Sequence, residues 1–134
     1  MQWLVKSDPE TYGFDELARD KQTCWDGVTN PVALKHLRNM AVGDLVYVYH
    51  SGAQKSVVGR AEVMRAAYPD PKRRDERLVV VDLRARDRLS TPVTLAHMKG
   101  DPAFASSPLV RQGRLSVVPL TEAQARVIER QAGQ

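Results

Sequence analysis

Residues 45–68 read LVYVYHSGAQKSVVGRAEVMRAAY, and this stretch decides the fold. Its apolar and β-branched residues predict one strand from Leu45 to His50 and a second from Ser56 to Tyr68. A third strand is predicted from Arg77 to Arg88, after the turn at Pro69-Asp70-Pro71. Strands that follow one another over short turns pair antiparallel, so the middle of the sequence predicts an antiparallel sheet.

Shorter strands and helices are predicted on both sides of this sheet. Two short strands run from Trp3 to Lys6 and from Leu115 to Val118, where Pro119 ends the second. Helices are predicted from Phe14 to Arg19, after the capping pair Asn30-Pro31, at Thr94, at Asp101-Pro102, and after Thr121, whose capping box Gln124 completes. This order lacks the regular alternation of a doubly wound parallel sheet. It favours the α+β class, with a curved, mostly antiparallel sheet or barrel surrounded by short helices.

The composition limits the protein to a few classes. The 134 residues are 43% hydrophobic, which suits one core and predicts a single domain over residues 1–134. The apolar runs are too short to cross a bilayer and no secretion signal opens the chain, so we expect no membrane partner and a cytoplasmic location. The formal net charge of +4 is compatible with a phosphate-bearing partner.

Most catalytic and cofactor motifs are absent from the sequence. It has no glycine-rich phosphate loop, no dinucleotide fingerprint and no Gly-x-Ser-x-Gly elbow, so we expect no cofactor. His36, His50 and His97 lack the spacing of a local metal motif, and the single cysteine, Cys24, allows neither an intrachain disulfide nor a Cys-rich zinc site. One catalytic alternative stays open, in which folding brings Cys24 and His50 together as nucleophile and base.

Trp25-Asp26-Gly27 is the strongest candidate for a site. Trp25 lies outside any periodic pattern, and Gly27 permits an unusual turn and close backbone approach. An indole can stack on a base while a carboxylate or backbone group reads the polar edge of that base. The structural alternative is a core tryptophan that anchors a loop.

Polar dipeptides at two predicted strand ends add to this candidate. Lys6-Ser7 and His50-Ser51 are expected to converge at one edge of the sheet, although each also suits ordinary turn chemistry, as Asn30 suits a helix cap.

Two of the three basic segments could contact a phosphate-bearing partner. Arg84, Arg86 and Arg88 alternate along one predicted strand and are expected on one face, either contacting phosphates or simply solvated. Arg111 and Arg114, around Gly113, are better candidates for backbone contacts, and residues 72–77 are expected to form a solvated loop.

Several strings of residues, in this order along the chain, carry a resemblance to a known family. They are WLVKSDP at residues 3–9, CWDGV at residues 24–28 followed by Asn30, Tyr49-His50-Ser51, Gly59, AYPD at residues 67–70, Val81-Asp82-Leu83 and LVRQGRLSV at residues 109–117. Their ordered combination resembles the EVE domain family and spans nearly all of the chain.

The resemblance implies a fold and a function. The family belongs to the PUA-like superfamily and is similar to YTH readers, which implies a barrel-like sheet surrounded by helices. It also implies recognition of a modified base without any reaction, with modified cytosine in DNA as the leading ligand and modified RNA as the alternative.

The same resemblance implies roles for individual residues. Trp25 resembles the aromatic wall of the pocket. The polar edge and floor are expected from Lys6, Ser7, Asp26, Gly27, Val28 and Asn30, and the rim from Tyr49, His50 and Ser51. Arg111, Gln112 and Arg114 resemble a late basic loop that contacts the nucleic-acid backbone.

Some positions depart from the family pattern. Thr29 stands where many members carry arginine, and Pro31-Val32 replaces a frequent aromatic-polar pair. Loss of a cation beside Asp26 bears on base preference and phosphate affinity. Two alternatives to a nucleic-acid-binding module stay open. One is a module that uses the same cleft for a free nucleoside, another small molecule or a peptide, and the other is the Cys24-dependent enzyme.

Overall fold

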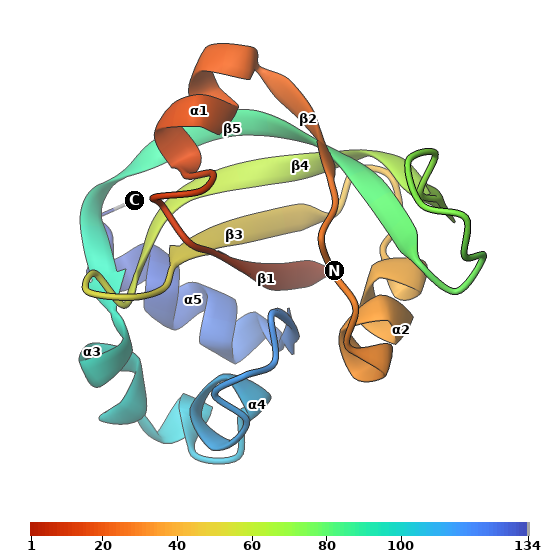
Figure 1. The fold of residues 1–134 in the computed structure, drawn as a ribbon. Coiled ribbons are helices and arrows are strands. Elements are labelled where there is room, and N and C mark those ends of the chain that lie inside the picture. The colour runs from red at the N-terminus through yellow and green to blue at the C-terminus, as the bar shows by residue number, and fades with distance from the viewer. Residues whose placement is uncertain (134) are drawn as a thin grey trace.

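Six strands form one curved sheet in the computed structural model, which describes residues 1–133 (Figure 1). The strands are β1 (Gln2–Ser7), β2 (Gln22–Trp25), β3 (Leu45–His50), β4 (Ser56–Pro69), β5 (Val79–Thr94) and β6 (Val117–Leu120). Their spatial order is β2-β5-β4-β3-β1-β6, and every neighbouring pair is antiparallel except β1 with β3. The predicted α+β class with a mostly antiparallel sheet is confirmed.

Short helices surround the sheet, and α1 lies on the opposite side from α3, α4 and α5 (Figure 1). They are α1 (Phe14–Asp20), α2 (Pro31–Asn39), α3 (Leu95–Lys99), the 3-10 turn η1 (Pro102–Phe104), α4 (Pro108–Arg111) and α5 (Glu122–Gln131). Side-chain caps begin most of them as predicted, since Asn30 accepts from two N–H groups of α2, and Thr121 and Gln124 form the capping box of α5. Within residues 1–133 no helix is long and apolar enough to cross a bilayer.

The sequence-based boundaries differ from the structure in four places. Strand β5 continues six residues beyond its predicted end at Arg88, because Val93 and Thr94 pair again with β4. Strand β2 was not predicted, because its four residues lack a clear alternation and owe their extended form to pairing with β5. Strand β6 runs through Pro119, which an edge strand tolerates because the missing N–H need not pair. Helix α4, capped by Ser107, was also missed.

The parallel pairing of β1 with β3 brings two strand ends together. Ser7 lies opposite His50, and the Ser51 N–H donates to the Ser7 carbonyl oxygen at 2.9 Å. This confirms the predicted convergence of Lys6-Ser7 with His50-Ser51. Parallel strands need a long crossover connection, and residues 8–44, which include α1, β2 and α2, supply it.

A glycine allows α1 to pack closely on the sheet. Phe14 at the start of α1 is 1% exposed, and its ring lies against Gly59 of β4. A Cβ atom at residue 59 would lie 2.3 Å from a ring carbon of Phe14, a distance that real Cβ contacts do not reach. The absence of a side chain at Gly59 therefore fixes how near the first helix approaches the sheet.

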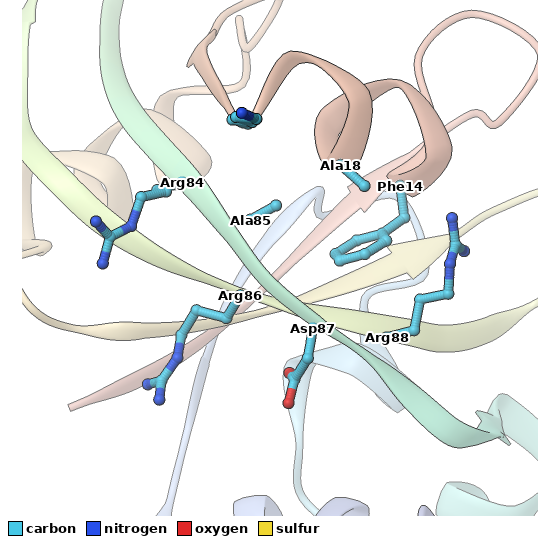
Figure 2. Close-up of a pocket in the computed structure, with 8 residues that line it drawn as sticks. Phe14, Ala18, Arg84, Ala85, Arg86, Asp87 and Arg88 are labelled. Atoms are coloured by element: carbon cyan, nitrogen blue, oxygen red, sulfur yellow. The ribbon is translucent and has the colours of Figure 1, made fainter.

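A β-bulge overturns the prediction that three arginines of β5 share one face. Ala85 pairs with Ala61 and Asp87 with Arg60, so Arg86 has no partner in β4 and the alternation of side chains reverses there. Arg84 forms an ion pair with Glu62 of β4, whereas Arg88 forms one with Asp15 of α1. The arginines therefore extend in different directions around the strand (Figure 2).

We predict that Gly59→Ala destabilises the fold by about 1–3 kcal/mol, because the added methyl group must displace the Phe14 ring from a filled core. Urea denaturation would measure this as a lower midpoint. Gly113→Ala is the matched control, since a Cβ atom there meets nothing within 4 Å. Equal midpoints for the two variants would contradict the assignment of Gly59 as a packing constraint.

Candidate ligand-binding cavity

A cavity of about 690 Å³ opens where the crossover connection meets the ends of β1 and β4. This size falls within the range of small-ligand sites. The side chains and backbone that line it come from Lys6, Ser7, Asp8, Thr11, Tyr12, Thr23, Cys24, Trp25, Asp26, Gly27, Val28, Tyr68, Asp70, Pro71, Lys72 and Ser116. Six of the predicted base-binding residues are among them: Lys6, Ser7, Trp25, Asp26, Gly27 and Val28.

Trp25 is both a cavity residue and a core residue. It ends β2 opposite Val81 of β5, is 6% exposed, and packs within the hydrophobic core. The Tyr12 ring meets the indole edge to face, with ring centroids 6.4 Å apart and planes at 80°. The indole therefore lines a hollow and also packs in the core, as the structural interpretation of Trp25 expects, whereas stacking of a base on the indole stays a prediction.

The loop that follows Trp25 is tied to the turn between β4 and β5. Gly27 has a φ of +81°, which suits glycine, and the next carbonyl oxygen, that of Val28, accepts from the Arg73 guanidinium at 3.5 Å. Arg73 Nε also donates to the Asp70 carboxylate at 2.7 Å. The Lys72 N–H and then the Arg73 side chain lower the pKa of Asp70. Arg73 thus departs from the predicted solvated loop and joins two walls of the cavity.

Lys6 connects the cavity to the late basic loop. Its Nζ donates to the Gly113 carbonyl oxygen at 2.8 Å and lies 5.6 Å from the centre of the Tyr49 ring. Burial lowers the pKa of this amine. The Lys6 N–H also donates to the Ser116 carbonyl oxygen at 2.9 Å, so the loop before β6 is held at the edge of the cavity.

The predicted backbone-contact residues of this loop are exposed. They are Arg111, Gln112 and Arg114, and Arg111 Nε donates to the Ala105 carbonyl oxygen at 3.1 Å. Their guanidinium and amide groups face solvent next to the segment that Lys6 holds. Contact with a nucleic-acid backbone stays a prediction for these three residues.

Four predicted residues lie outside the cavity lining. Asn30 caps α2, and Tyr49 is buried beneath Lys6. His50 Nε2 accepts from the Phe14 N–H at 2.9 Å, its Nδ1 faces Gln54, and the Ser51 hydroxyl donates to Ser7. These contacts position the lining residues, and a direct role in ligand contact stays a prediction.

Several lining residues carry little signal in the sequence. Tyr12, Thr23 and Tyr68 were not singled out, because Tyr12 precedes a helix and Thr23 belongs to the unrecognised strand β2. The Tyr68 hydroxyl donates to the Asp82 carboxylate at 2.6 Å and lies 3.6 Å from Cys24 Sγ. A strand prediction for residues 22–25 would have pointed to Thr23 beside Trp25, since alternate residues of a strand share a face.

The surroundings of Cys24 disfavour nucleophilic chemistry. Burial raises the pKa of the thiol, the Tyr68 hydroxyl opposes this, and nearby carboxylates, that of Asp26 first, raise it further. Reactive cysteines have a lowered pKa. The proposed base, His50, uses both ring nitrogens for contacts with Phe14 and Gln54. Residues 1–133 also contain no group of three His, Cys, Asp or Glu side chains arranged to hold a metal ion.

We predict that iodoacetamide alkylates Cys24 more slowly at pH 7.5 than it alkylates an unstructured cysteine peptide, because the raised pKa leaves less thiolate. The rate should rise at a higher pH than the rate of the peptide. Mass spectrometry would follow the single adduct, and Cys24→Ser would serve as the unlabelled control. Labelling as fast as that of the peptide at pH 7.5 would contradict the raised pKa.

The fold and the cavity define a class of small α+β domain in which a crossover connection and the strand ends line a hollow. The sequence matches the EVE domain family over residues 1–131. The chain belongs to the EVE domain family, and the predicted PUA-like fold is confirmed.

Known proteins similar to this chain include one curated relative and two solved structures. Thymocyte nuclear protein 1 of Mus musculus is 32% identical, over 90% of this chain and 68% of that protein. The NMR structure of Rpa0253 from Rhodopseudomonas palustris is 39% identical with a TM-score of 0.91, over 98% of this chain and 92% of that one. The human THYN1 protein in complex with DNA containing 5-methylcytosine is 26% identical with a TM-score of 0.88, over 99% and 98% of the two chains.

Proposed function

We propose that this chain is a non-catalytic module that binds nucleic acid and takes a modified base, modified cytosine in DNA foremost, into the cavity beside Trp25. The single observation that carries the proposal is the position of that indole, which lines a cavity of about 690 Å³ surrounded by hydrogen-bonding groups. The human THYN1 protein, whose structure contains 5-methylcytosine DNA, supports the choice of ligand.

The cavity offers both kinds of contact that a base requires. The Trp25 indole provides a flat apolar face, which Tyr12 holds at a fixed angle. Hydroxyl groups of Ser7 and Thr23 and the carboxylate of Asp26 surround it and can meet the polar edge of a base. A base that leaves the stack of its own strand would therefore replace a neighbouring base by the Trp25 indole, and its polar edge would form hydrogen bonds with these protein groups.

The same contacts explain why binding without turnover fits this site. The one thiol in the cavity has a raised pKa, and its neighbours are carboxylates and a tyrosine hydroxyl. The Lys72 N–H and the Arg73 side chain lower the pKa of the Asp70 carboxyl. These groups are suited to accept hydrogen bonds from a ligand and to position it.

Modified RNA and a free nucleoside are the alternative ligands. The dependence of the affinity on salt concentration distinguishes binding of a polynucleotide from binding of a nucleoside. Contacts with several phosphates release counterions, so the affinity for a polynucleotide falls steeply as salt rises, whereas the affinity for an uncharged nucleoside hardly changes. Matched DNA and RNA oligonucleotides that differ in one base modification would then identify the natural polymer.

We predict that Trp25→Leu weakens binding of an oligonucleotide containing 5-methylcytosine by roughly 1–3 kcal/mol, because leucine fills core space but offers no face for stacking. Trp25→Phe keeps a smaller aromatic face and should lose less. Fluorescence anisotropy at one salt concentration would measure both affinities. The fold of each variant should be checked by circular dichroism, because Trp25 also packs in the core.

Trp3→Leu is the matched control for this experiment. Trp3 is the other tryptophan, is 2% exposed, and donates from its indole to Asp44 at 2.9 Å, outside the cavity lining. The control loses an equal volume from the core, so it should lower stability and leave the affinity unchanged. Unchanged affinity in folded Trp25→Leu, for every modified oligonucleotide, would sink the proposal.

A further inference from the structure

A second concave surface, which we call the β5 groove, lies between α1 and β5. It encloses about 340 Å³ and is lined by Phe14, Ala18, Lys21, Arg84, Ala85, Arg86, Asp87 and Arg88 (Figure 2). Phe14 and Ala18 reach it from α1, and the remaining labelled residues come from β5 (Figure 2). None of these eight residues lines the cavity beside Trp25.

The groove lies where β5 loses one of its neighbours. Strand β2 pairs with β5 only as far as Gln22 with Arg84, and the next backbone contact is the Ala85 N–H donating to the Lys21 carbonyl oxygen at 2.9 Å. Beyond this contact, the outer edge of β5 at Arg86 to Arg88 has no strand partner within residues 1–133. The groove is therefore accessible from the side where the sheet is open.

Four of the eight lining residues are cationic, and two of these, Lys21 and Arg86, form no ion pair with the described residues, although the charge of Arg86 contributes to lowering the pKa of Asp87. Arg84 and Arg88 form ion pairs with Glu62 and Asp15. The side chains of Lys21 and Arg86 make no hydrogen bond or ion pair with any part of the chain that the structure describes.

The one acidic residue of the lining is already neutralised. Asp87 accepts from Arg60 Nε at 2.7 Å and from a second nitrogen of the same guanidinium, and this contact lowers the pKa of Asp87. Arg60 itself is also held by Glu129 of α5 at 3.0 Å. The Asp87 carboxylate is therefore occupied by the ion-pair network of Arg60 and Glu129. An incoming ligand meets a positive charge in the groove, which comes from Lys21 and Arg86.

The floor of the groove is apolar. Phe14, Ala18 and Ala85 supply it, and the Arg88 guanidinium carbon lies 5.3 Å from the centre of the Phe14 ring. A ligand that fits this surface combines an uncharged body with an anionic group. A sugar joined to a phosphate has this composition, since the sugar ring can rest on the floor while the phosphate meets the two unpaired cations.

We infer that the β5 groove binds a sugar-phosphate unit of the same nucleic-acid strand whose modified base enters the cavity beside Trp25. This inference rests on the proposed function. One short segment of chain links the two sites, because Tyr12, Thr23 and Trp25 line the cavity while Phe14 and Lys21 line the groove. A strand with one base in the cavity thus has its neighbouring nucleotides close to the segment that forms both surfaces.

The test is the double variant Lys21→Gln/Arg86→Gln, with Lys99→Gln/Arg130→Gln as the control. Lys99 and Arg130 are exposed, lie on α3 and α5, and line neither site, so the control loses the same charge elsewhere. Each protein would be titrated, over a range of salt, with an oligonucleotide containing one 5-methylcytosine, the unmodified oligonucleotide, free 5-methyldeoxycytidine and inorganic pyrophosphate.

We expect the groove variant to bind both oligonucleotides about tenfold more weakly, and the plot of log affinity against log salt to be less steep by roughly 0.7–0.9, which corresponds to one lost phosphate contact. Nucleoside binding should be unchanged. The inference is overturned if the oligonucleotide affinities and slopes are unchanged, if the control loses as much, or if only pyrophosphate binding falls.

The design separates this inference from the proposed function. If no protein binds the nucleoside or prefers the modified oligonucleotide, the proposal for the Trp25 cavity fails. A loss of unmodified oligonucleotide binding in the groove variant, absent from the control, would still support the groove as a contact for the nucleic-acid backbone.

Discussion

The parallel pairing of β1 with β3 is the constraint on which both surfaces depend. It places Ser7 opposite His50 and forces the chain between the two strands to leave the sheet and return to it. Residues 8–44 make this excursion, and on the way they add β2 to the far edge of the sheet by pairing with β5. The cavity is the space between that excursion and the strand ends, and the β5 groove begins where the pairing of β2 stops.

Local sequence signals predicted most elements of the fold because they act over a few residues. The Asn30 cap, the Thr121 capping box and the strand from Leu45 to His50 are examples in which the predicted and observed starts agree. Strand β2 could not be predicted because its extended form depends on partners in β5 that lie 56 to 62 positions later in the chain. The bulge at Arg86 also escaped, since only the register of two paired strands reveals an extra residue.

The candidate site was predictable in part for a similar reason. Trp25 and the converging strand ends could be inferred from residue type and position, and the structure brings six predicted residues to one cavity. The role of Arg73 could not, because a charged loop gives no sign that one of its arginines will reach both Asp70 and the Val28 carbonyl oxygen. A local pattern indicates which residues can contact a ligand, whereas long-range contacts decide which of them hold the walls in place.

The unpartnered stretch of β5 has a consequence for how copies of the protein meet one another. An exposed strand edge has unpaired N–H and C=O groups that can pair with a strand of another molecule, and such pairing leads to aggregation. Here the bulge interrupts the regular ladder, Arg86 adds a positive charge that repels a second copy, and the exposed Pro92 lacks an N–H to offer a neighbouring chain. The protein can therefore leave this edge of β5 uncovered while remaining a poor partner for intermolecular strand pairing.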